Sequence, residues 1–497
     1  MANIIFSDWT PDAARLGGPG NITATNAVPA AQGYQPFQLL SVISTALDAR
    51  PRGAIEAYDS QNVSYQYAGN ETKLYSFNAD TLAWADVSIG GGYATGTDEI
   101  WNFARWKNKI LAVNFSNNPQ QITMGAALFS NLTTALRARN IAVVGDFVVM
   151  SNTYDGSDGN VPNRVRWSAI DDETDWTVSA STLSDYRDLP TGGPVRKVVG
   201  GEVGIVVSER SVYRMSYVGA PAVFQMDEIL PDIGALSSGA VTNIGESVYF
   251  VSQQGFIELT GNGSGINRIG AGRVDKTFLN DLDPDYYHRI TSIADPTSNR
   301  ILWGYPGAGN TGGRPNKIIL YDRTFNKWAL IEEEVELLLK SKGVSLTLDE
   351  LDGLGYTDID VMDVSLDSDT FKRSASQIAA FDEDFKLGFF RGLNKTATLE
   401  TAELELNPGA QTHLSYFIPL VDAGTVTARV AYRNRQSDSA TYSGSYSQST
   451  QGRFDTRINA RFMRMELTVS GETWRDAIGI QIDSGGAKRA GGRGRVS

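Results

Sequence analysis

Short apolar runs separated by Gly, Asp and Asn recur along most of this 497-residue sequence. Between residues 141 and 180, two such runs flank Gly145-Asp146, a polar loop follows, and two further segments contain Trp167 and Trp176. Apolar runs of this length around tight-turn residues are typical of β-strands joined by hairpins. The stretch therefore predicts one four-stranded antiparallel sheet.

Similar units precede and follow this stretch. Seven apolar segments each mark one strand of a unit, and most are spaced by roughly 40 to 55 residues, close to the period of β-propeller blades. They are centred near Val63, Ile110, Phe147, Val203, Val248, Ile301 and Phe385. The segments LYSFNADTLAW (74–84) and LYDRTFNKW (320–328) share an aromatic strand, an Asp/Asn turn and a Trp. This internal similarity predicts repeated sheets.

The fold class predicted is all-β, a β-propeller of about six blades, with five or seven as the alternatives. Radial packing of four-stranded sheets buries both faces of each sheet and leaves only short edges. Six rather than seven blades are expected if the first and last units share one sheet and close the ring. Large aromatic side chains suit the wedge between blades. The structural blade aromatics predicted are Trp84, Trp167, Trp176 and Trp328.

Changes in residue composition and in the pattern of apolar residues divide the chain into four segments. Residues 1–53, rich in Pro, Gly, Ala and Asn, are expected to form an extended arm that packs on the C-terminal domain or on a partner. Residues 54–398 form the propeller, with an insertion at about 332–371 that begins with a short helix over 332–342. Residues 399–484 alternate as in a β-sandwich, to which the arm contributes. Residues 485–497 form a basic, Gly-rich tail.

Composition excludes several kinds of chemistry. The chain has no Cys and only two His, His288 and His413, so disulfides, thiolate sites and a His-rich metal site are excluded. No metal or other cofactor is expected. A formal net charge of −13 argues against coating by nucleic acid. Neither a leader peptide nor an apolar run long enough to span a bilayer is expected.

Two motifs and one type of catalysis suggest functions that their sequence context does not support. Gly307 to Gly312 matches G-x-G-x-x-G, but a strand rather than a helix follows it, so a hairpin loop is expected. The segment SAIDDETDW (168–176) approaches the Asp-box of sialidase-type propellers but lacks its spacing and its Gly. Glycoside hydrolysis needs two carboxylates across a cleft, and no two acids can be paired from sequence alone. We therefore assign no catalytic residue.

One local basic patch lies at the C-terminus of the chain. Basic tails of this kind contact phosphates or acidic protein surfaces, and the alternative is a solvated tail without a contact. The residues that we predict for contact with a partner or with DNA are Lys488, Arg489, Arg493 and Arg495.

Several strings taken together resemble the tail nozzle proteins of short-tailed bacteriophages, also described as tail tube or packaged-DNA-stabilisation proteins. The strings are SDWTPD (7–12), YQPFQLLSVISTALDARPRGAIEAYD (34–59), YAGNETKLYSF (67–77), RVRWSAIDDETDW (164–176) and the region 365–392. The resemblance covers nearly the whole length of the chain. None of these strings is catalytic in character.

The resemblance implies a non-enzymatic virion protein, made in the host cytoplasm and located in the tail. In this family, a propeller-containing subunit forms a hexameric ring below the portal and its head-to-tail adaptor, retains packaged DNA and conducts it during ejection. The implied partners are further copies of the chain, the adaptor, tail fibres or tailspikes, and double-stranded DNA in the lumen without sequence-specific binding. No membrane is implied. The alternative functions are a propeller glycoside hydrolase and a receptor-binding tail component, both acting on host surface glycans.

Overall fold

The protein is built almost entirely of β-strands. The computed structural model describes residues 2–14, 20–295, 298–343, 376–482 and 487–489. Strands make up 53% and helix 3% of it, which confirms the all-β prediction. Its described part contains one α-helix, α1 (Asp275–Asp281), and two short 3-10 helices, η1 (Ser238–Ala240) and η2 (Tyr287–Arg289).

Five separate four-stranded sheets follow one another along the chain, each an antiparallel succession of neighbouring strands. The first three comprise β6 (Gly53–Tyr58), β7 (Ser64–Gly69), β8 (Leu74–Asn78) and β9 (Ala83–Asp86); β10 (Asn102–Trp106), β11 (Lys109–Val113), β12 (Gln120–Thr123) and β13 (Ser130–Asn131); and β14 (Leu136–Val144), β15 (Phe147–Asp155), β16 (Gly159–Trp167) and β17 (Asp185–Asp188). The next two comprise β18 (Val195–Val199), β19 (Gly204–Ser208), β20 (Ser211–Gly219) and β21 (Val223–Pro231); and β22 (Val241–Ile244), β23 (Ser247–Ser252), β24 (Gly255–Thr260) and β25 (Gly265–Arg268). The stretch 141–180 contributes part of β14 and all of β15 and β16 to the third sheet. The strand expected around Trp176 is wrong, because the fourth strand of this sheet is β17, which lies beyond the stretch.

Two further four-stranded units complete the set. One consists of β26 (Thr291–Asp295), β27 (Arg300–Tyr305), β28 (Lys317–Asp322) and β29 (Lys327–Glu332), and it continues into a larger sheet described below. The other consists of β30 (Leu337–Lys342), β31 (Ser376–Phe381), β32 (Leu387–Asn394) and β5 (Gln38–Val42). The segment 307–312 joins β27 to β28, as expected for a hairpin loop.

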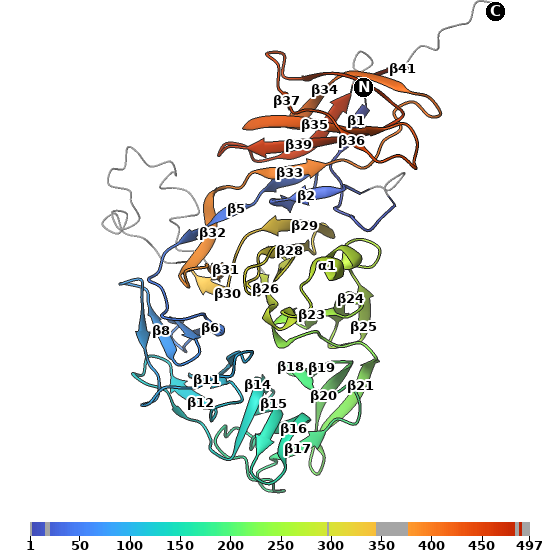
Figure 1. Cartoon of the computed structure of the whole chain (residues 1–497). Helices are drawn as coiled ribbons and strands as arrows, with labels where there is room; N and C mark the ends of the chain where they lie inside the picture. Colours follow the sequence, from blue (N-terminus) through green and yellow to red (C-terminus); the bar gives the residue numbers. More distant parts are fainter. Residues whose placement is uncertain (1, 15–19, 296–297, 344–375, 483–486, 490–497) are drawn as a thin grey trace, which may run out of the picture.

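These seven units stand around a ring, the arrangement of a β-propeller (Figure 1). The first strand of each unit contacts the first strand of the next, and β30 contacts β6, which closes the circle. A separate hydrophobic cluster fills nearly every interface between neighbouring units, and the cluster between the fifth and sixth units extends into the C-terminal sheets. The ring is therefore held by burial of both faces of each sheet.

The sequence predicts about six blades, whereas the ring has seven four-stranded units. Two features of the last unit explain the difference. The last unit takes its fourth strand, β5, from the N-terminal arm, so the first and last units do not share a sheet. The short helix expected over 332–342 is wrong, because Leu337 to Lys342 form strand β30. Leu338 packs with the sixth unit, while Leu339 packs toward the first unit, so side chains alternate between two faces as in a strand. Residues 344–371 of the predicted insertion lie outside the described residues.

Two sheets form the C-terminal region. One contains β3 (Ala27–Pro29), β4 (Tyr34–Pro36), β40 (Ala477–Ile482), β34 (Thr412–Val421) and β38 (Phe454–Ala460), with β1 (Ala2–Ile5) and β41 (Ala487–Arg489) attached. The other contains β2 (Thr23–Thr25), β33 (Ala397–Glu400), β39 (Phe462–Ser470), β35 (Thr425–Arg433), β36 (Thr441–Tyr442) and β37 (Tyr446–Ser447). Residues of both sheets belong to one hydrophobic cluster.

The N-terminal arm joins this region to the ring. Strand β2 pairs with β33 on one side and with β29 on the other, so a single sheet runs from the ring into the C-terminal region. Asp8 forms an ion pair with Arg273 at 2.7 Å, and the Asp12 carboxylate accepts hydrogen bonds from the backbone of α1 at Lys276 and Thr277. The arm is thus a structural connector of the two regions.

Candidate functional site: the central cavity of the ring

The first strands of all seven units enclose a central cavity of about 430 Å³. A smaller hollow of about 120 Å³ adjoins it and shares Asp98, Asn102, Ser238 and His288 with it. Pockets at the centre of a ring of blades are formed by residues that are distant in sequence, because each strand contributes one or two side chains. Functional side chains can therefore meet here without any sequence motif.

Glycines allow the segments at the mouth of the cavity to approach closely. A Cβ atom at Gly53 would lie 2.1 Å from the carbonyl oxygen of Trp101, and one at Gly239 would lie 2.0 Å from that of Ile290. No other residue fits these contacts without a shift of backbone. The two glycines thus set the spacing of neighbouring units at the cavity wall.

Two arginines before β6 lie at this mouth. Arg52 is buried, its guanidinium donates to the Gly96 carbonyl and to Glu71 at 3.1 Å, and its Nε has no hydrogen-bond partner. Arg50 has only one hydrogen bond, to the Thr97 carbonyl at 3.5 Å, and no ion pair within the described part of the chain. Burial, with repulsion from Arg289 and Arg52, lowers the pKa of Arg50 to about 10. The guanidinium of Arg50 therefore stands without a counter-charge in contact.

The loop before β26 brings a third arginine to the same mouth. Arg289 donates to the carboxylate of Glu336 and to the carbonyl of Gly312, and its Nε is buried without a partner. Glu336 also accepts from Arg314 at 2.8 Å, so two guanidinium groups share one carboxylate. The carboxylate of Glu336 is therefore already engaged and does not neutralise Arg50.

The cavity's one histidine is His288, whose Nε2 lies 3.3 Å from Asp98. Burial lowers the pKa of His288, and the positive charges of Arg50 and Arg289 lower it further against the opposing effect of Asp98. We expect a neutral imidazole at pH 7. His288 therefore adds hydrogen-bonding capacity to the cavity rather than charge.

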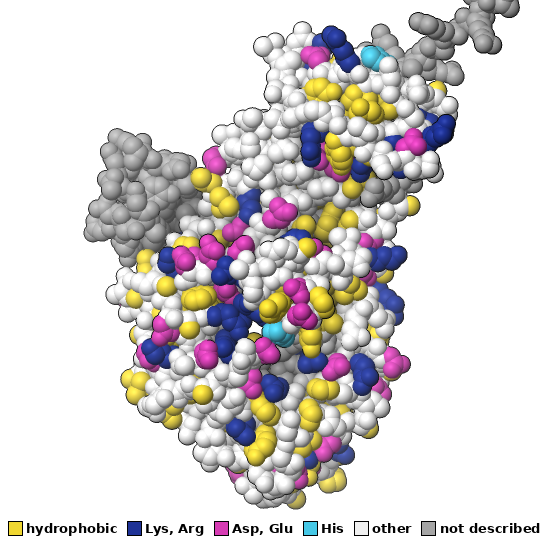
Figure 2. All heavy atoms as spheres, in the orientation of Figure 1, with side chains coloured by type: hydrophobic (Ala, Val, Ile, Leu, Met, Phe, Trp, Pro, Cys, Tyr) yellow, Lys and Arg dark blue, Asp and Glu magenta, His cyan; other side chains and the backbone are white. Residues whose placement is uncertain are grey.

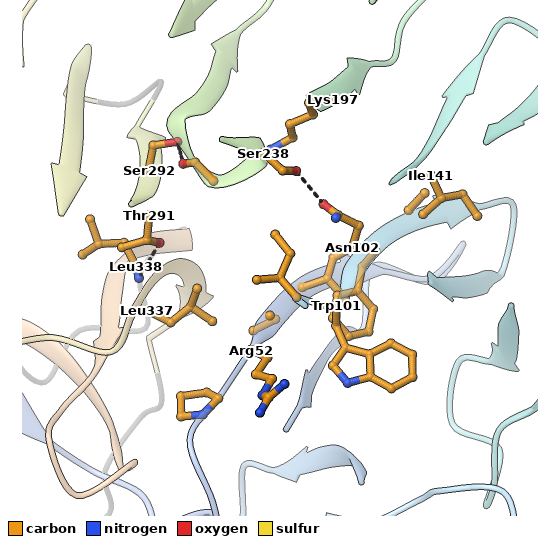
Figure 3. Close-up of a pocket in the computed structure, with 18 of the residues that line it drawn as sticks. Arg52, Trp101, Asn102, Ile141, Lys197, Ser238, Thr291, Ser292, Leu337 and Leu338 are labelled. Carbon is orange, nitrogen blue, oxygen red and sulfur yellow. Dashed lines mark hydrogen bonds between the residues drawn. The ribbon is translucent and has the colours of Figure 1, made fainter. Parts of the chain in front are cut away.

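Lys197 faces the cavity from β18, on the far side of the ring from β6. Figure 3 shows Lys197 above and Arg52 below the hydrogen bond between Ser238 and Asn102. The Nζ atom of Lys197 donates to the carbonyl of Val241 at 2.9 Å, and no carboxylate of the described residues forms an ion pair with Lys197. Burial lowers the pKa of Lys197 to about 8. An isolated ammonium group at this place costs stability.

Charge in the cavity is opposite to the charge of the chain. Five cationic side chains line it, against two carboxylates, Asp98 and Glu336, whereas the chain as a whole carries a formal net charge of −13. Figure 2 shows Lys and Arg side chains gathered near the middle of the visible face, beside a His. The five cations are Arg50, Arg52, Arg105, Lys197 and Arg289.

Sequence reasoning missed all five of these cations because they are scattered over the chain. A faint signal exists: the string RPRG (50–53) and the string YHRI (287–290) both stand directly before the first strand of their units. The ends of first strands meet at the mouth of a propeller, so basic residues at this repeated place gather there.

The aromatic residues predicted from sequence lie between neighbouring units. Trp167 packs in the cluster between the third and fourth units, Trp176 between the second and third, and Trp328 between the fifth and sixth. All three are buried, while Trp84 is partly buried and packs against Phe381 of the last unit. None of the four lines the central cavity.

Of the four predicted tail cations, the structure describes the backbone of two. Lys488 and Arg489 belong to β41, whose backbone pairs with β34 in the C-terminal region, opposite His413 and Thr412. Arg493 and Arg495 lie outside the described residues.

The Asp-box-like segment forms a structural turn. Asp172 accepts hydrogen bonds from the backbone and the hydroxyl of Thr174. Glu173 accepts from the indole of Trp106 and from Lys109, which ties the third unit to the second. Its acids therefore serve packing between sheets.

Neither a metal-ligand cluster nor a membrane-spanning helix occurs among the described residues. No group of three or more His, Cys, Asp or Glu among them is placed to hold a metal ion. None of their helices has the length and apolarity required to cross a membrane.

Comparison with known proteins returned structures alone. No family model and no curated protein matches the sequence. Among solved structures, the computationally designed Ika8 protein is similar with a TM-score of 0.36 and 9% identity, over 71% of this chain and 98% of that one. BamB from Moraxella catarrhalis is similar with a TM-score of 0.35 and 10% identity, over 74% and 95% respectively. The description of the ring rests on this chain's own strand pairing.

Proposed function

We propose that this chain is a structural, non-enzymatic subunit of the tail nozzle of a short-tailed bacteriophage. The observation that carries the proposal is the place of the strings that resemble nozzle proteins. Residues 34–59 run from β4 in the C-terminal region, through the ring-closing strand β5, into β6 of the first unit. Residues 7–12 contain Asp8 and Asp12, which fasten the arm to the ring. Two of the five resembling strings thus connect the parts of one scaffold.

The finer architecture belongs to the same proposal. We take the seven units as the blades of one propeller. The two C-terminal sheets with the arm are then a β-sandwich-like platform spanning 399–484 and parts of 1–53. The sheet that continues from β29 through β2 into β33 supports a fixed attachment of platform to propeller. A ring subunit needs such a rigid joint, since flexible joints do not repeat a contact angle.

Assembly follows from the proposed role. Copies of the chain form a hexamer below the portal and adaptor, with tail fibres or tailspikes as further partners, in the tail of a virion made in the host cytoplasm. DNA passes the lumen without sequence-specific contacts and without a membrane. The net charge of −13 supports sliding, because a basic lumen would hold the duplex by counterion release.

Electron microscopy of the assembled proteins tests this proposal. The chain is mixed with the portal–adaptor complex of the same virus and examined in negative stain. We expect sixfold rings attached to the adaptor. A chain that stays monomeric in that mixture would overturn the proposal.

A second candidate function is a receptor-binding tail component, favoured by the cationic central cavity. A glycoside hydrolase is less well supported, because Glu336, one of the cavity's two carboxylates, is held by Arg289 and Arg314. Binding of the chain to host surface glycans without their cleavage would favour the second candidate. Turnover of such glycans would instead favour the enzyme.

A further inference from the structure

We propose that the central cavity binds a small molecule that carries a compact oxyanion, a phosphate or carboxylate group, with Arg50 as its main cationic contact and Lys197 adding positive charge from the opposite wall. This binding site goes beyond the proposed role in a tail, and it stands or falls independently of ring formation.

The charge of the lining comes first. Five cations face two carboxylates in the cavity, and one of these carboxylates, Glu336, is already shared by two guanidinium groups. The other, Asp98, is largely exposed and lies beside His288. An excess of positive charge inside an acidic chain attracts anions into the cavity, where low-dielectric walls strengthen the field.

Free hydrogen-bond donors come second. A guanidinium has five N–H groups arranged to bind phosphate or carboxylate with two parallel hydrogen bonds. Arg50 uses one of them, in a long bond to the Thr97 carbonyl, and the Nε atoms of Arg52 and Arg289 are buried without partners. Donors are therefore available on three side chains at the same mouth.

Lys197 carries a charge that no described carboxylate compensates. One of its three N–H donors goes to the Val241 carbonyl. A cation in such surroundings is destabilising unless an anion offsets its desolvation. A bound oxyanion would supply that counter-charge, and burial already lowers the pKa of Lys197.

Size and lining define the class of ligand. A cavity of about 430 Å³ matches pockets for small molecules. Its walls also carry apolar side chains, among them Ile141, Leu337 and Leu338, beside the hydroxyls of Thr291 and Ser292 (Figure 3). This lining suits an anionic group on a small polar body such as a sugar.

Calorimetric titration of the full-length chain tests the site. Inorganic phosphate is titrated at pH 7, with ionic strength held constant by NaCl. We expect saturable binding of one phosphate per chain. We expect Arg50→Ala to weaken it by about tenfold or more, since a charge-assisted hydrogen bond contributes 1.4 kcal/mol or more. We expect Lys197→Met to weaken it by a smaller factor, since Lys197 acts across the cavity. Circular dichroism verifies the fold of each variant.

A matched control uses Arg214, which pairs with Asp227 on another sheet surface and does not line the cavity. Arg214→Ala removes the same charge and is expected to bind phosphate as the wild type does. Equal weakening in this variant would overturn the proposal, because it would show a general effect of net charge. Should Arg50→Ala fail to fold, Lys197→Met carries the test alone.

Parallel titrations distinguish the source of the anion. Glucose 6-phosphate and glucuronate represent anions on a sugar, and glucose is the neutral comparison. Tighter binding of either sugar acid than of phosphate supports a sugar-borne anion, and equal binding supports a free oxyanion. Absence of binding by all three anions, or binding of glucose as tight as theirs, overturns the proposal.

Discussion

The chain has two basic regions, and they differ in how they arise. The four cations at 488–495 are close in sequence, at the edge of the C-terminal region or beyond the described residues. The cations of the central cavity come from positions as distant as 50, 197 and 289, and only closure of the ring brings them together. The first group is close together in sequence, whereas the members of the second become neighbours only through the fold. Clusters of charged residues in the sequence therefore do not predict where the folded chain gathers positive charge.

The largest expected effect comes from loosening the scaffold of the cavity. Trp167 is fully buried between the third and fourth units, and its indole donates to the Leu183 carbonyl at 2.9 Å. Trp167→Ala should lower the free energy of unfolding by about 3–5 kcal/mol, because it leaves a large cavity. Urea denaturation measures this. The exposed Val178 of the same stretch is the control, and Val178→Ala should change stability by less than about 0.5 kcal/mol. Similar losses in both variants would contradict the packing described here.

A somewhat smaller loss is expected at the cavity mouth. Gly239→Ala places a methyl group against the Ile290 carbonyl, which has to shift. We expect a loss of about 1–3 kcal/mol, typical of overpacking. Thermal denaturation checks it. Gly145, in an open turn, is unsuited as a control because its φ is positive, but Gly156→Ala meets no atom within 4 Å and should be neutral.

Removing the isolated ammonium group of Lys197 should raise the stability of the fold, whereas the two substitutions above lower it. The pKa of Lys197 is lowered by burial from 10.5 to about 8, so the folded state disfavours its charged form. The resulting cost is complete below pH 8, declines as pH rises to about 10.5, and vanishes above it. Lys197→Met should therefore stabilise the chain by about 1 kcal/mol at pH 7 and by nothing at pH 11. Chemical denaturation at both pH values measures the difference, and equal stability of variant and wild type at pH 7 would refute the isolated charge.

The pH profile of anion binding sharpens the same point. Sulfate keeps its charge from pH 6 to 9, while Lys197 loses its proton near pH 8. We expect sulfate affinity to fall severalfold across this interval in the wild type and to stay nearly constant in Lys197→Met. Arg50, whose pKa is lowered to about 10, stays charged across most of this interval. The other charged or titratable groups that line the cavity are Arg52, Arg105, Arg289, Asp98, Glu336 and His288. Parallel slopes in the two proteins would contradict the role of Lys197.

Local patterns in the sequence predict the sheets well. Each of the seven marked apolar segments lies in a different unit, because inner strands that are buried on both faces appear in the sequence as short continuous apolar runs. Pairing of β5 with β32 joins residues 38–42 to residues 388–394, which no local pattern encodes. The segment 332–342 predicts a helix because its acids come first and its lysines last, as suits a helix dipole. Burial of Leu337 to Leu339 between sheets decides instead for strand β30.

The residues of the candidate site are harder to predict from the sequence than the sheets are. Arg50, Arg52, Lys197 and Arg289 each look like ordinary surface charges in their own segments. Their partners and their shortage of counter-charges are properties of the closed ring. By contrast, the tail cations were conspicuous because they are neighbours in sequence. Prediction from sequence therefore favoured the tail over the cavity.

The most direct measurement is the stoichiometry of labelled phosphate by equilibrium dialysis in two full-length variants. In one, Lys488, Arg489, Arg493 and Arg495 are all replaced by Ser; in the other, Arg50 is replaced by Ala. We predict one phosphate per chain with unchanged affinity in the tail variant, and affinity weakened about tenfold in Arg50→Ala. Loss of binding in the tail variant, with wild-type binding in Arg50→Ala, would place the anion site in the tail and contradict the cavity.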